Sequence, residues 1–400
     1  MAKLNIVYNT HCGKTPSAYM PLFSARMAEI SKNFHSTVDG YAPTPLAAFN
    51  STAKQLGTGE IYVKDESYRF GLNAFKALGG SFCVGRYIAD LLGKDISSLS
   101  YSDLVSPRTK ASVGDITFVT ATDGNHGRGI AWTAAKLGQK TVVYMPKGSA
   151  AERLENIRRL GAVSEMTDAN YDDTVRFAKQ QAADNGWVLV QDTAWEGYET
   201  IPTYIMQGYL TMAAEAVQQL GGKNPTHIFL QAGVGAMAGA LAAFFRDIYG
   251  FEPKIVVVEP DKADCFYHTA KADDGNIHTV GGALDTIMAG LACGEPCTIG
   301  WDLLKFCADA FISMEDTVAA NGMRIMAAPL AEDTAVTSGE SGAAGFGAAA
   351  EILRNHPQIK TDLAMDENST VLCFSTEGAT DVENYRNIVW YGKWADKEFK

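Results

Sequence analysis

From Ile116 onward the chain alternates short apolar runs, glycine-rich turns and helix-like stretches, and this rhythm limits the fold more than any other feature. The first cycle consists of the apolar run ITFVTA, the polar turn TDGNHGRG, a helical stretch through Lys136 and the apolar run TVVYMP. Such a succession of strand, helix and strand is a βαβ unit, in which the two strands lie parallel. The pattern continues to the run WVLVQD, so the sequence predicts a parallel sheet covered by helices.

A second stretch with the same rhythm follows Asp192. It comprises the helical segment TYIMQGYLTMAAEAVQQLG, the strand-like THIFLQAG, a glycine-rich turn, the helical GALAAFFRDIYG and the strand-like KIVVVEP. Two such units predict two α/β domains with a cleft between them, a large one over residues 1–72 and 188–400 and a small one over 73–187. Ligands of parallel sheets bind where the strands end. The candidate binding loops are therefore TDGNHG, AGVGAMAG and STEGATD.

Composition and charge argue against several classes of protein. With 400 residues, 46% of them hydrophobic and 20% charged, the chain can bury a large core. The formal net charge of −12 is spread without a basic stripe, which argues against nucleic acid as a partner, and no run approaches the roughly 20 apolar residues of a membrane helix. Seven scattered cysteines without a CxxC pair or a metal-ligand spacing predict reduced thiols in the cytoplasm and no metal site. The spacing of Cys265, Cys293 and Cys297 leaves a disulfide among them open.

The loop GVGAMAG, residues 233–239, lies between a predicted strand and a predicted helix. Free backbone N–H groups and the helix dipole make such a turn an anion site, so a phosphate group can bind there. The same letters also fit a GxGxxA dinucleotide fingerprint, with Glu259 ending the next strand about twenty residues later. Taken alone, the loop leaves open a nucleotide, another phosphate ligand, or a tight turn that needs small residues.

Two further segments carry polar groups among small residues. In NAFKALGG, Lys76 precedes a helix-like stretch of small residues, where backbone can approach its amine closely. The turn TATDGNHGRG supplies Asp123, Asn125 and His126 among three glycines, which admit a ligand close to the backbone. Each residue has an ordinary interpretation by itself: a surface lysine, a turn carboxylate or amide, a core histidine. Their occurrence together favours a binding site.

Together these loops resemble the fold-type II pyridoxal-phosphate enzymes, the group that includes threonine and serine dehydratases, threonine synthase, cysteine synthase and the tryptophan synthase β chain. The resemblance runs almost from end to end. The family motifs read here as Phe75-Lys76, the turn 122–127, the loop 233–239, and Phe374-Ser375-Thr376. The resemblance implies an α/β fold of the tryptophan synthase β type, with two domains, mainly parallel sheets, and pyridoxal 5′-phosphate in the cleft between them.

The resemblance also implies a role for each motif. Lys76 would carry the cofactor as a Schiff base, and Asn125 would hydrogen-bond its 3′-oxygen. The amides of the glycine-rich loop would hold the phosphate, and Ser375, with Thr376 as the second choice, would meet the pyridine nitrogen. The segment ESGAAG, residues 340–345, is similar to the family's helix start near the cofactor. The loop residues so assigned are Gly233, Val234, Gly235, Ala236, Met237 and Gly239.

Asp123 departs from the family pattern, which has a serine or a neutral group in this turn. A carboxylate here would face the α-carboxylate of a substrate, which is unfavourable unless Asp123 accepts the proton at Cα or faces a cationic group such as a β-ammonium. Asp192, at the end of another predicted strand in QDTAWEGYETIP, adds a second carboxylate. Both features are similar to those of the diaminopropionate-cleaving members of the group. The residues then expected to contact the substrate are Thr122, Asp123, Gly124 and His126.

The resemblance therefore implies elimination of ammonia from a small amino acid, 2,3-diaminopropionate, which yields pyruvate. Lys76 is the expected base on one face of the substrate and Asp123 on the other, so both the D and the L isomer would react, while Asp192 or Asp123 would recognise the β-ammonium. The family's usual homodimer is the expected assembly. Three alternatives stay open: a threonine or serine dehydratase, an NAD-dependent oxidoreductase suggested by residues 233–259, and a catalytically silent binding protein.

Overall fold

The computed structural model describes residues 2–122 and 124–395, and its larger sheet has seven strands in the order β1-β10-β9-β8-β11-β3-β2. The five strands from β10 to β3 run parallel, whereas β1 and β2 lie antiparallel at the two edges. The α/β unit predicted after Asp192 is confirmed, because β8 and β9 are neighbouring parallel strands. The strands are β1 (Leu4–Tyr8), β2 (Leu46–Ala48), β3 (Glu60–Asp65), β8 (His227–Gln231), β9 (Lys254–Pro260), β10 (Ala310–Met314) and β11 (Thr370–Ser375).

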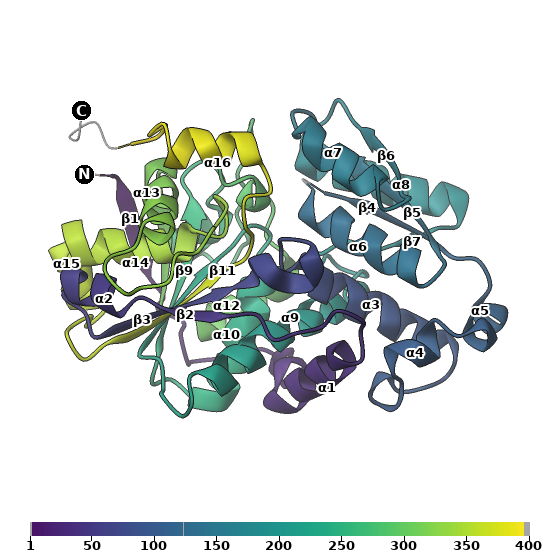
Figure 1. Cartoon of the computed structure of the whole chain (residues 1–400), viewed down its shortest axis with the longest axis horizontal. Coiled ribbons are helices and arrows are strands. Elements are labelled where there is room, and N and C mark those ends of the chain that lie inside the picture. The colour runs from purple at the N-terminus through teal and green to yellow at the C-terminus, as the bar shows by residue number, and fades with distance from the viewer. Residues whose placement is uncertain (1, 123, 396–400) are drawn as a thin grey trace.

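The smaller sheet has four parallel strands in the order β6-β5-β4-β7. The βαβ unit predicted from Ile116 onward is confirmed, since β4 leads into α6 (Asn125–Lys136) and then into β5. Figure 1 shows this sheet and its helices on one side of the molecule, apart from the larger sheet. The strands are β4 (Thr117–Ala121), β5 (Lys140–Met145), β6 (Val163–Met166) and β7 (Val188–Leu189), and the last lies just past the 73–187 range.

The central strands of the larger sheet are buried along their whole length, which explains why their sequences are continuous apolar runs rather than alternating ones. Helices cover both faces. Residues of α9 (Thr200–Gln219), α10 (Ala236–Tyr249) and α12 (Thr298–Cys307) belong to one hydrophobic cluster. Residues of α13 (Asp316–Ala327) and α14 (Ala344–Asn355) belong to a second. The sheet therefore forms the middle layer of three.

Helix α3 (Lys76–Leu91) connects the two sheets, because it packs against α6 on one side and α9 on the other. Glycines permit this close packing. A Cβ at Gly79 would lie 2.5 Å from the Tyr209 ring, and a Cβ at Gly129 would lie 3.0 Å from the Lys76 backbone. The first distance is too short for any other residue, and the second is tighter than most real Cβ contacts. The small residues around Lys76 therefore hold the start of α3 at the junction of three helices.

A buried ionic network underlies the segment that leads to α3. The Arg69 guanidinium donates to Glu66 from Nε at 2.9 Å and to Glu215 from Nη2 at 2.8 Å, and Lys64 Nζ lies 2.7 Å from Glu215. All four side chains are buried, and the two positive charges balance the two negative ones. The network joins β3 and the following turn to α9, and the sequence patterns gave no sign of it.

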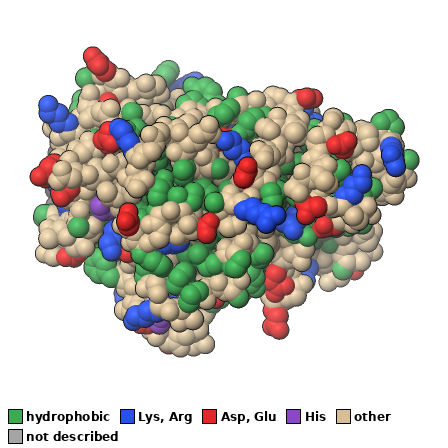
Figure 2. Space-filling view, turned by 90° about the horizontal axis from the view of Figure 1, so that it is seen from below, with side chains coloured by type: hydrophobic (Ala, Val, Ile, Leu, Met, Phe, Trp, Pro, Cys, Tyr) green, Lys and Arg blue, Asp and Glu red, His purple; other side chains and the backbone are tan. Residues whose placement is uncertain are grey.

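The surface mixes charges of both signs, and Figure 2 shows hydrophobic side chains gathered on the face that carries α1 (Ala25–Ser36). Within the described part of the chain, no helix combines the length and hydrophobicity of a membrane span. The remaining helices are α2 (Asn50–Leu56), α4 (Tyr101–Leu104), α5 (Pro107–Val113), α7 (Ala151–Arg158), α8 (Tyr171–Asn185), α11 (Cys265–Ala272), α15 (Pro357–Asp362) and α16 (Val382–Val389).

Candidate active site

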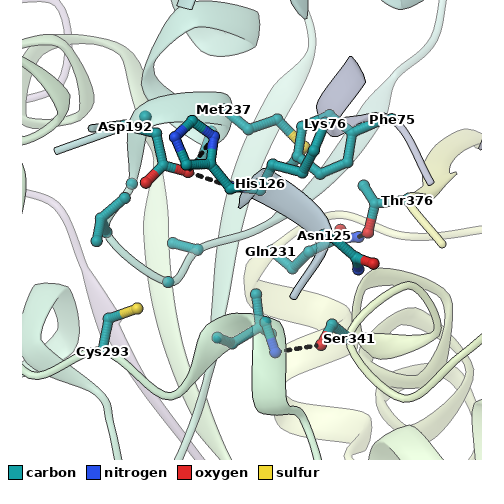
Figure 3. A pocket seen from close by; sticks show the side chains of 18 of the residues that line it. Phe75, Lys76, Asn125, His126, Asp192, Gln231, Met237, Cys293, Ser341 and Thr376 are labelled. Atoms are coloured by element: carbon teal, nitrogen blue, oxygen red, sulfur yellow. Dashed lines mark hydrogen bonds and ion pairs between the residues drawn. The ribbon is translucent and has the colours of Figure 1, made fainter. Parts of the chain in front are cut away.

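One pocket brings together most of the residues selected from the sequence (Figure 3). It lies where β4, β8 and β11 end and where α3 begins. Gly124, Gly239 and Ser375 are not part of its lining, and Asp123 lies outside the described residues. The predicted residues that line the pocket are Lys76, Thr122, Asn125, His126, Asp192, Gly233, Val234, Gly235, Ala236, Met237 and Thr376.

Lys76 is the first residue of α3, and its amine forms an ion pair with Asp192. The backbone fixes this position, because the Phe75 amide donates to the Thr376 carbonyl at 3.0 Å. Burial by itself raises the pKa of Asp192, but the charges of Lys76 and His126 outweigh it and hold the pKa at about 2. Asp192 is therefore ionised at every pH of interest, with its charge directed at the lysine amine (Figure 3).

The turn after β4 is organised by its own hydrogen bonds. The Thr122 hydroxyl accepts from the Gly124 amide at 2.9 Å, and Gly124 has a φ of +147°, a conformation that favours glycine. His126 Nε2 donates to the Val190 carbonyl at 2.8 Å, which leaves Nδ1 facing Asp192 at 3.8 Å. His126 therefore combines the two interpretations of the sequence: it is a buried, hydrogen-bonded histidine, and it also lines the pocket.

The glycine-rich loop leads into α10, and its residues 233–238 line the pocket. Gly235 precedes the helix with a φ of +84°, and a Cβ there would lie 2.2 Å from the Phe266 ring. The helix N-terminus makes the loop an anion site. Glu259 distinguishes the dinucleotide interpretation of the loop from the phosphate interpretation. Its buried carboxylate accepts from the amides of Phe266 and Tyr267 at 2.9 and 2.7 Å, and the residue does not line the pocket. It is thus not positioned to hold a ribose, which argues against a dinucleotide.

The end of β11 presents one hydroxyl to the pocket and one to the protein interior. The Ser375 hydroxyl donates to Ser338 Oγ at 2.8 Å and does not contribute to the lining. Thr376, the second choice from the sequence, lines the pocket and accepts from Gln231 Nε2 at 3.0 Å. Successive residues of an extended chain point to opposite sides, so only one of the two hydroxyls can face the cavity.

Three polar residues of the lining were missed by the sequence analysis: Tyr171, Gln231 and Glu377. Glu377 Oε2 accepts from Asn125 Nδ2 at 2.5 Å, and its other oxygen accepts from the Ser341 amide at 3.2 Å. The Tyr171 hydroxyl lies 3.5 Å from Asp192 Oδ1. Glu377 belongs to a loop that the sequence did select, whereas Tyr171 begins α8 and Gln231 ends an apolar strand, and neither position carries a distinguishing signal.

A second cavity adjoins the pocket, and both share Tyr171 and Ala289 in their lining. This outer cavity carries charges of both signs, among them Arg153 and Glu340. Burial, followed by repulsion from Glu377, raises the pKa of Glu340 to about 7. Charged groups of both signs therefore lie in the cavity next to the pocket that contains Lys76.

The pocket combines an amine, an anion site and hydrogen-bonding groups. Lys76 can react with an aldehyde, and the amides that begin α10 can hold a phosphate. Asn125 and Thr376 line the same pocket and add an amide and a hydroxyl. The arrangement therefore fits a small phosphorylated aldehyde with polar atoms on its ring.

Comparison with known proteins gives the same chemistry. Residues 38–376 match the family model described as pyridoxal-phosphate dependent enzyme. The chain is 51% identical over 382 residues to the diaminopropionate ammonia-lyase of Escherichia coli strain K12, covering 94% of each chain. It is similar to the crystal structure of the Escherichia coli enzyme in complex with D-serine, with a TM-score of 0.92, 48% identity and 98% of each chain covered. A threonine deaminase from Solanum lycopersicum shares the fold alone, with a TM-score of 0.73 at 17% identity over 99% of each chain.

Proposed function

Since this chain belongs to the family of pyridoxal-phosphate-dependent enzymes, we propose that it is a lyase that converts 2,3-diaminopropionate to pyruvate. The reaction consumes one water and releases two molecules of ammonia, one from the β-carbon and one from the α-carbon. The observation that carries the proposal is the ion pair between Lys76 and Asp192, inside a pocket that also contains an anion site.

The residues that would hold the cofactor are Lys76 at its aldehyde, Asn125 at its 3′-oxygen, the amides of residues 233–238 at its phosphate, and Thr376 at its ring nitrogen. When bound, pyridoxal phosphate withdraws electrons from the α-carbon of an attached amino acid and so makes its proton acidic. Ser375, which faces Ser338, supports the strand end from behind.

Lys76 is the base that takes the proton from Cα on its own face of the substrate. Asp192 supports this role, because its negative charge is already in place to pair with the ammonium group that Lys76 becomes. Burial raises the pKa of Asp192, but the charges of Lys76 and His126 lower it, so the charged pair is favoured once Lys76 holds the proton. We assign the opposite face to Asp123, which extends the proposal to both the D and the L isomer.

Asp192 also distinguishes among leaving groups. A buried carboxylate attracts a β-ammonium but gains little from a neutral hydroxyl, since only the former supplies a compensating charge. The Tyr171 hydroxyl lies on the same side of the pocket, 3.5 Å from Asp192 Oδ1. Diaminopropionate is therefore favoured over serine and threonine, the substrates of the dehydratase alternative.

The test is pyruvate formation from D- and L-2,3-diaminopropionate, compared with serine, threonine and O-acetylserine. The purified protein should be yellow, and borohydride should fix the cofactor to the peptide that contains Lys76. The Lys76→Met variant should lose activity toward both isomers, whereas Lys140→Met, at an exposed position in β5, should retain it. Turnover of serine or threonine in preference to diaminopropionate would favour the dehydratase.

We further propose that the chain acts as a homodimer in the cytoplasm and that it divides into domains at 1–72 with 188–400 and at 73–187. The hydrophobic face beside α1 offers a surface that a second copy can cover (Figure 2). The sparse cysteines suit a reducing compartment. Sedimentation equilibrium of the holoenzyme measures the assembly directly, and a monomer at micromolar concentration would contradict it.

A further inference from the structure

Glu377 is a buried carboxylate in the wall of the pocket that has no part in the mechanism above. It lies just past β11 in the larger sheet, yet its Oε2 accepts at 2.5 Å from Nδ2 of Asn125, the first residue of α6 beside the smaller sheet. Its Oε1 accepts from the Ser341 amide at 3.2 Å. Figure 3 shows Asn125 across the pocket from Asp192. Two N–H groups from distant segments therefore meet at one carboxylate.

The surrounding backbone packs closely around the Glu377 side chain. The Glu377 carbonyl accepts from the Gly339 amide at 2.9 Å. A Cβ at Gly339 would lie 3.0 Å from Glu377 Cγ, and a Cβ at Gly342 would lie 2.8 Å from the Glu377 carbonyl oxygen. The two glycines let the chain close over this side chain, and the carboxylate is held between Asn125 and Ser341.

Glu377 is an acceptor toward both neighbours. A backbone N–H can only donate, so the Ser341 amide requires an oxygen that carries no hydrogen. Burial, followed by the charge of Glu377, raises the pKa of Glu340 to about 7, so near neutral pH it is Glu340 that takes up a proton. Because the Glu377 carboxylate has no hydrogen to give, the Asn125 amide must turn its NH2 group toward it and its oxygen away.

This orientation leaves one amide hydrogen of Asn125 for the pocket. The two hydrogens of a planar NH2 group diverge, so Glu377 takes only one of them. Among the residues that the structure describes, Asn125 Nδ2 has no other acceptor, and Asn125 lines the pocket. In the proposed function Asn125 meets the 3′-oxygen of the cofactor. An N–H directed at that oxygen stabilises its negatively charged form.

We propose that Glu377 is a positioning residue that locks the Asn125 amide in the orientation that donates a hydrogen to the 3′-oxygen of the bound cofactor. The proposal rests on the proposed function, because it takes pyridoxal phosphate as the occupant. The reversed amide would bring its own oxygen against the 3′-oxygen. That contact is favourable only if the proton of the Schiff-base nitrogen moves to the 3′-oxygen, which then donates to Asn125. Glu377 therefore keeps this proton on the nitrogen that Lys76 supplies.

The test is the absorbance of the protein loaded with pyridoxal phosphate, which is yellow with the proton on the Schiff-base nitrogen and absorbs in the near ultraviolet with the proton on the 3′-oxygen. The wild type should be yellow at neutral pH. In Glu377→Gln the single side-chain oxygen accepts from the Ser341 amide, which cannot turn, so the new NH2 group faces Asn125 and the Asn125 amide must reverse. The near-ultraviolet fraction should rise at least about tenfold.

Glu377→Met separates the direction of the hydrogen bond from its presence. Methionine favours neither orientation of the Asn125 amide, which can then follow the cofactor, so the near-ultraviolet fraction should rise less than in Glu377→Gln. A merely structural role predicts the opposite order, since methionine also leaves the Ser341 amide without its acceptor.

Two controls exclude general disturbance. Glu351→Gln makes the same change in another buried carboxylate, which accepts from Asn355 Nδ2 at 3.0 Å and does not line the pocket, and it should leave the absorbance unchanged. In the Asn125→Ala background Glu377→Gln should have no further effect, because the amide that transmits it is gone.

The outcomes are distinct. A wild type in the near-ultraviolet form overturns the proposal, as does an unchanged spectrum in Glu377→Gln or a rise in Glu377→Met as large as in Glu377→Gln. If Glu377→Gln does not fold, Glu377→Met decides: its spectrum should lie between those of the wild type and Asn125→Ala, and a spectrum equal to the wild type overturns the proposal. A wild type that binds no pyridoxal phosphate would instead refute the proposed function. The cofactor released by alkali is counted whichever atom held the proton, so the two failures are distinguishable.

Discussion

Replacing Asp192 by asparagine removes the carboxylate that faces Lys76, and the structure sets the size of the effect. In the folded protein the pKa of Asp192 falls from 3.8 to about 2, a difference worth about 2 kcal/mol of stability at neutral pH. Asparagine also leaves the Lys76 ammonium without its partner in a largely enclosed site. We expect Asp192→Asn to lower the free energy of unfolding by about 2–3 kcal/mol in urea titrations of the protein freed of cofactor.

The sign of the pH dependence follows from the direction of the shift. Because the folded pKa lies below the unfolded value, the contribution of Asp192 is complete above pH 4 and disappears as the pH falls from about 4 to about 2. The wild type and Asp192→Asn should therefore differ most at neutral pH and converge in acid.

A double-mutant cycle with Lys76→Met isolates the ion pair, and we expect a coupling energy of about 2 kcal/mol. Asp65→Asn is the matched control, because Asp65 is also buried. Burial raises the pKa of Asp65, so replacing it by a neutral amide should lower the free energy of unfolding less than Asp192→Asn does. A coupling energy below about 0.5 kcal/mol would refute the view that Asp192 is held ionised by Lys76.

Three further perturbations test other parts of the structure. Gly235→Ala should weaken pyridoxal-phosphate binding at least about tenfold in fluorescence titrations, because Gly235 has a φ of +84° and a Cβ there would clash with Phe266. Gly281→Ala, in open space, should leave the affinity unchanged, and equal affinities of the two variants would rule out a tight loop. Glu215→Gln should cost about 3–5 kcal/mol of unfolding free energy in urea, since it removes the carboxylate that pairs with the buried Lys64 and leaves Arg69 with Glu66 alone. A loss under about 1 kcal/mol would contradict that account. Burial raises the pKa of Glu340 to about 7, so its contribution to stability declines as the pH rises from about 4.5 to about 7. Glu340→Gln should remove this decline of about 3 kcal/mol and flatten the pH profile of stability, and identical profiles for the two proteins would speak against it.

The sequence predicted the parallel sheets, the fold-type II family, the cofactor and the lyase activity, and the comparisons confirm all four. These features depend on local patterns: an apolar run predicts a buried strand, and a glycine-rich turn before a helix predicts an anion site. Asn125 was found because it lies in such a turn, and Lys76 because it precedes a helix-like stretch of small residues and matches the family motif Phe75-Lys76. The isomers, the domain limits and the individual site roles stay predictions.

Other features depend on contacts that no local pattern records. Whether Ser375 or Thr376 faces the pocket depends on how β11 ends against its neighbours, which the order of the letters does not reveal. In the sequence Gln231 is only the last residue of an apolar strand, and its hydrogen bond to Thr376 on the neighbouring strand becomes visible only in the structure. The dinucleotide interpretation of the loop failed for the same reason, because Glu259 is bound to the start of α11, a helix outside the motif.

The place of β11 has a consequence for how the protein is made. β11 is the last strand in the chain, yet it lies inside the larger sheet, between β8 and β3. During synthesis β3 and β8 are made before the strand that lies between them, so the sheet cannot close until β11 has been made. Contacts between segments so far apart in the chain form slowly. The same insertion brings Thr376 to the Phe75 amide and so fixes the start of α3. The recovery of the yellow colour during refolding should therefore time the closing of the sheet, and chains released before β11 is made would remain colourless.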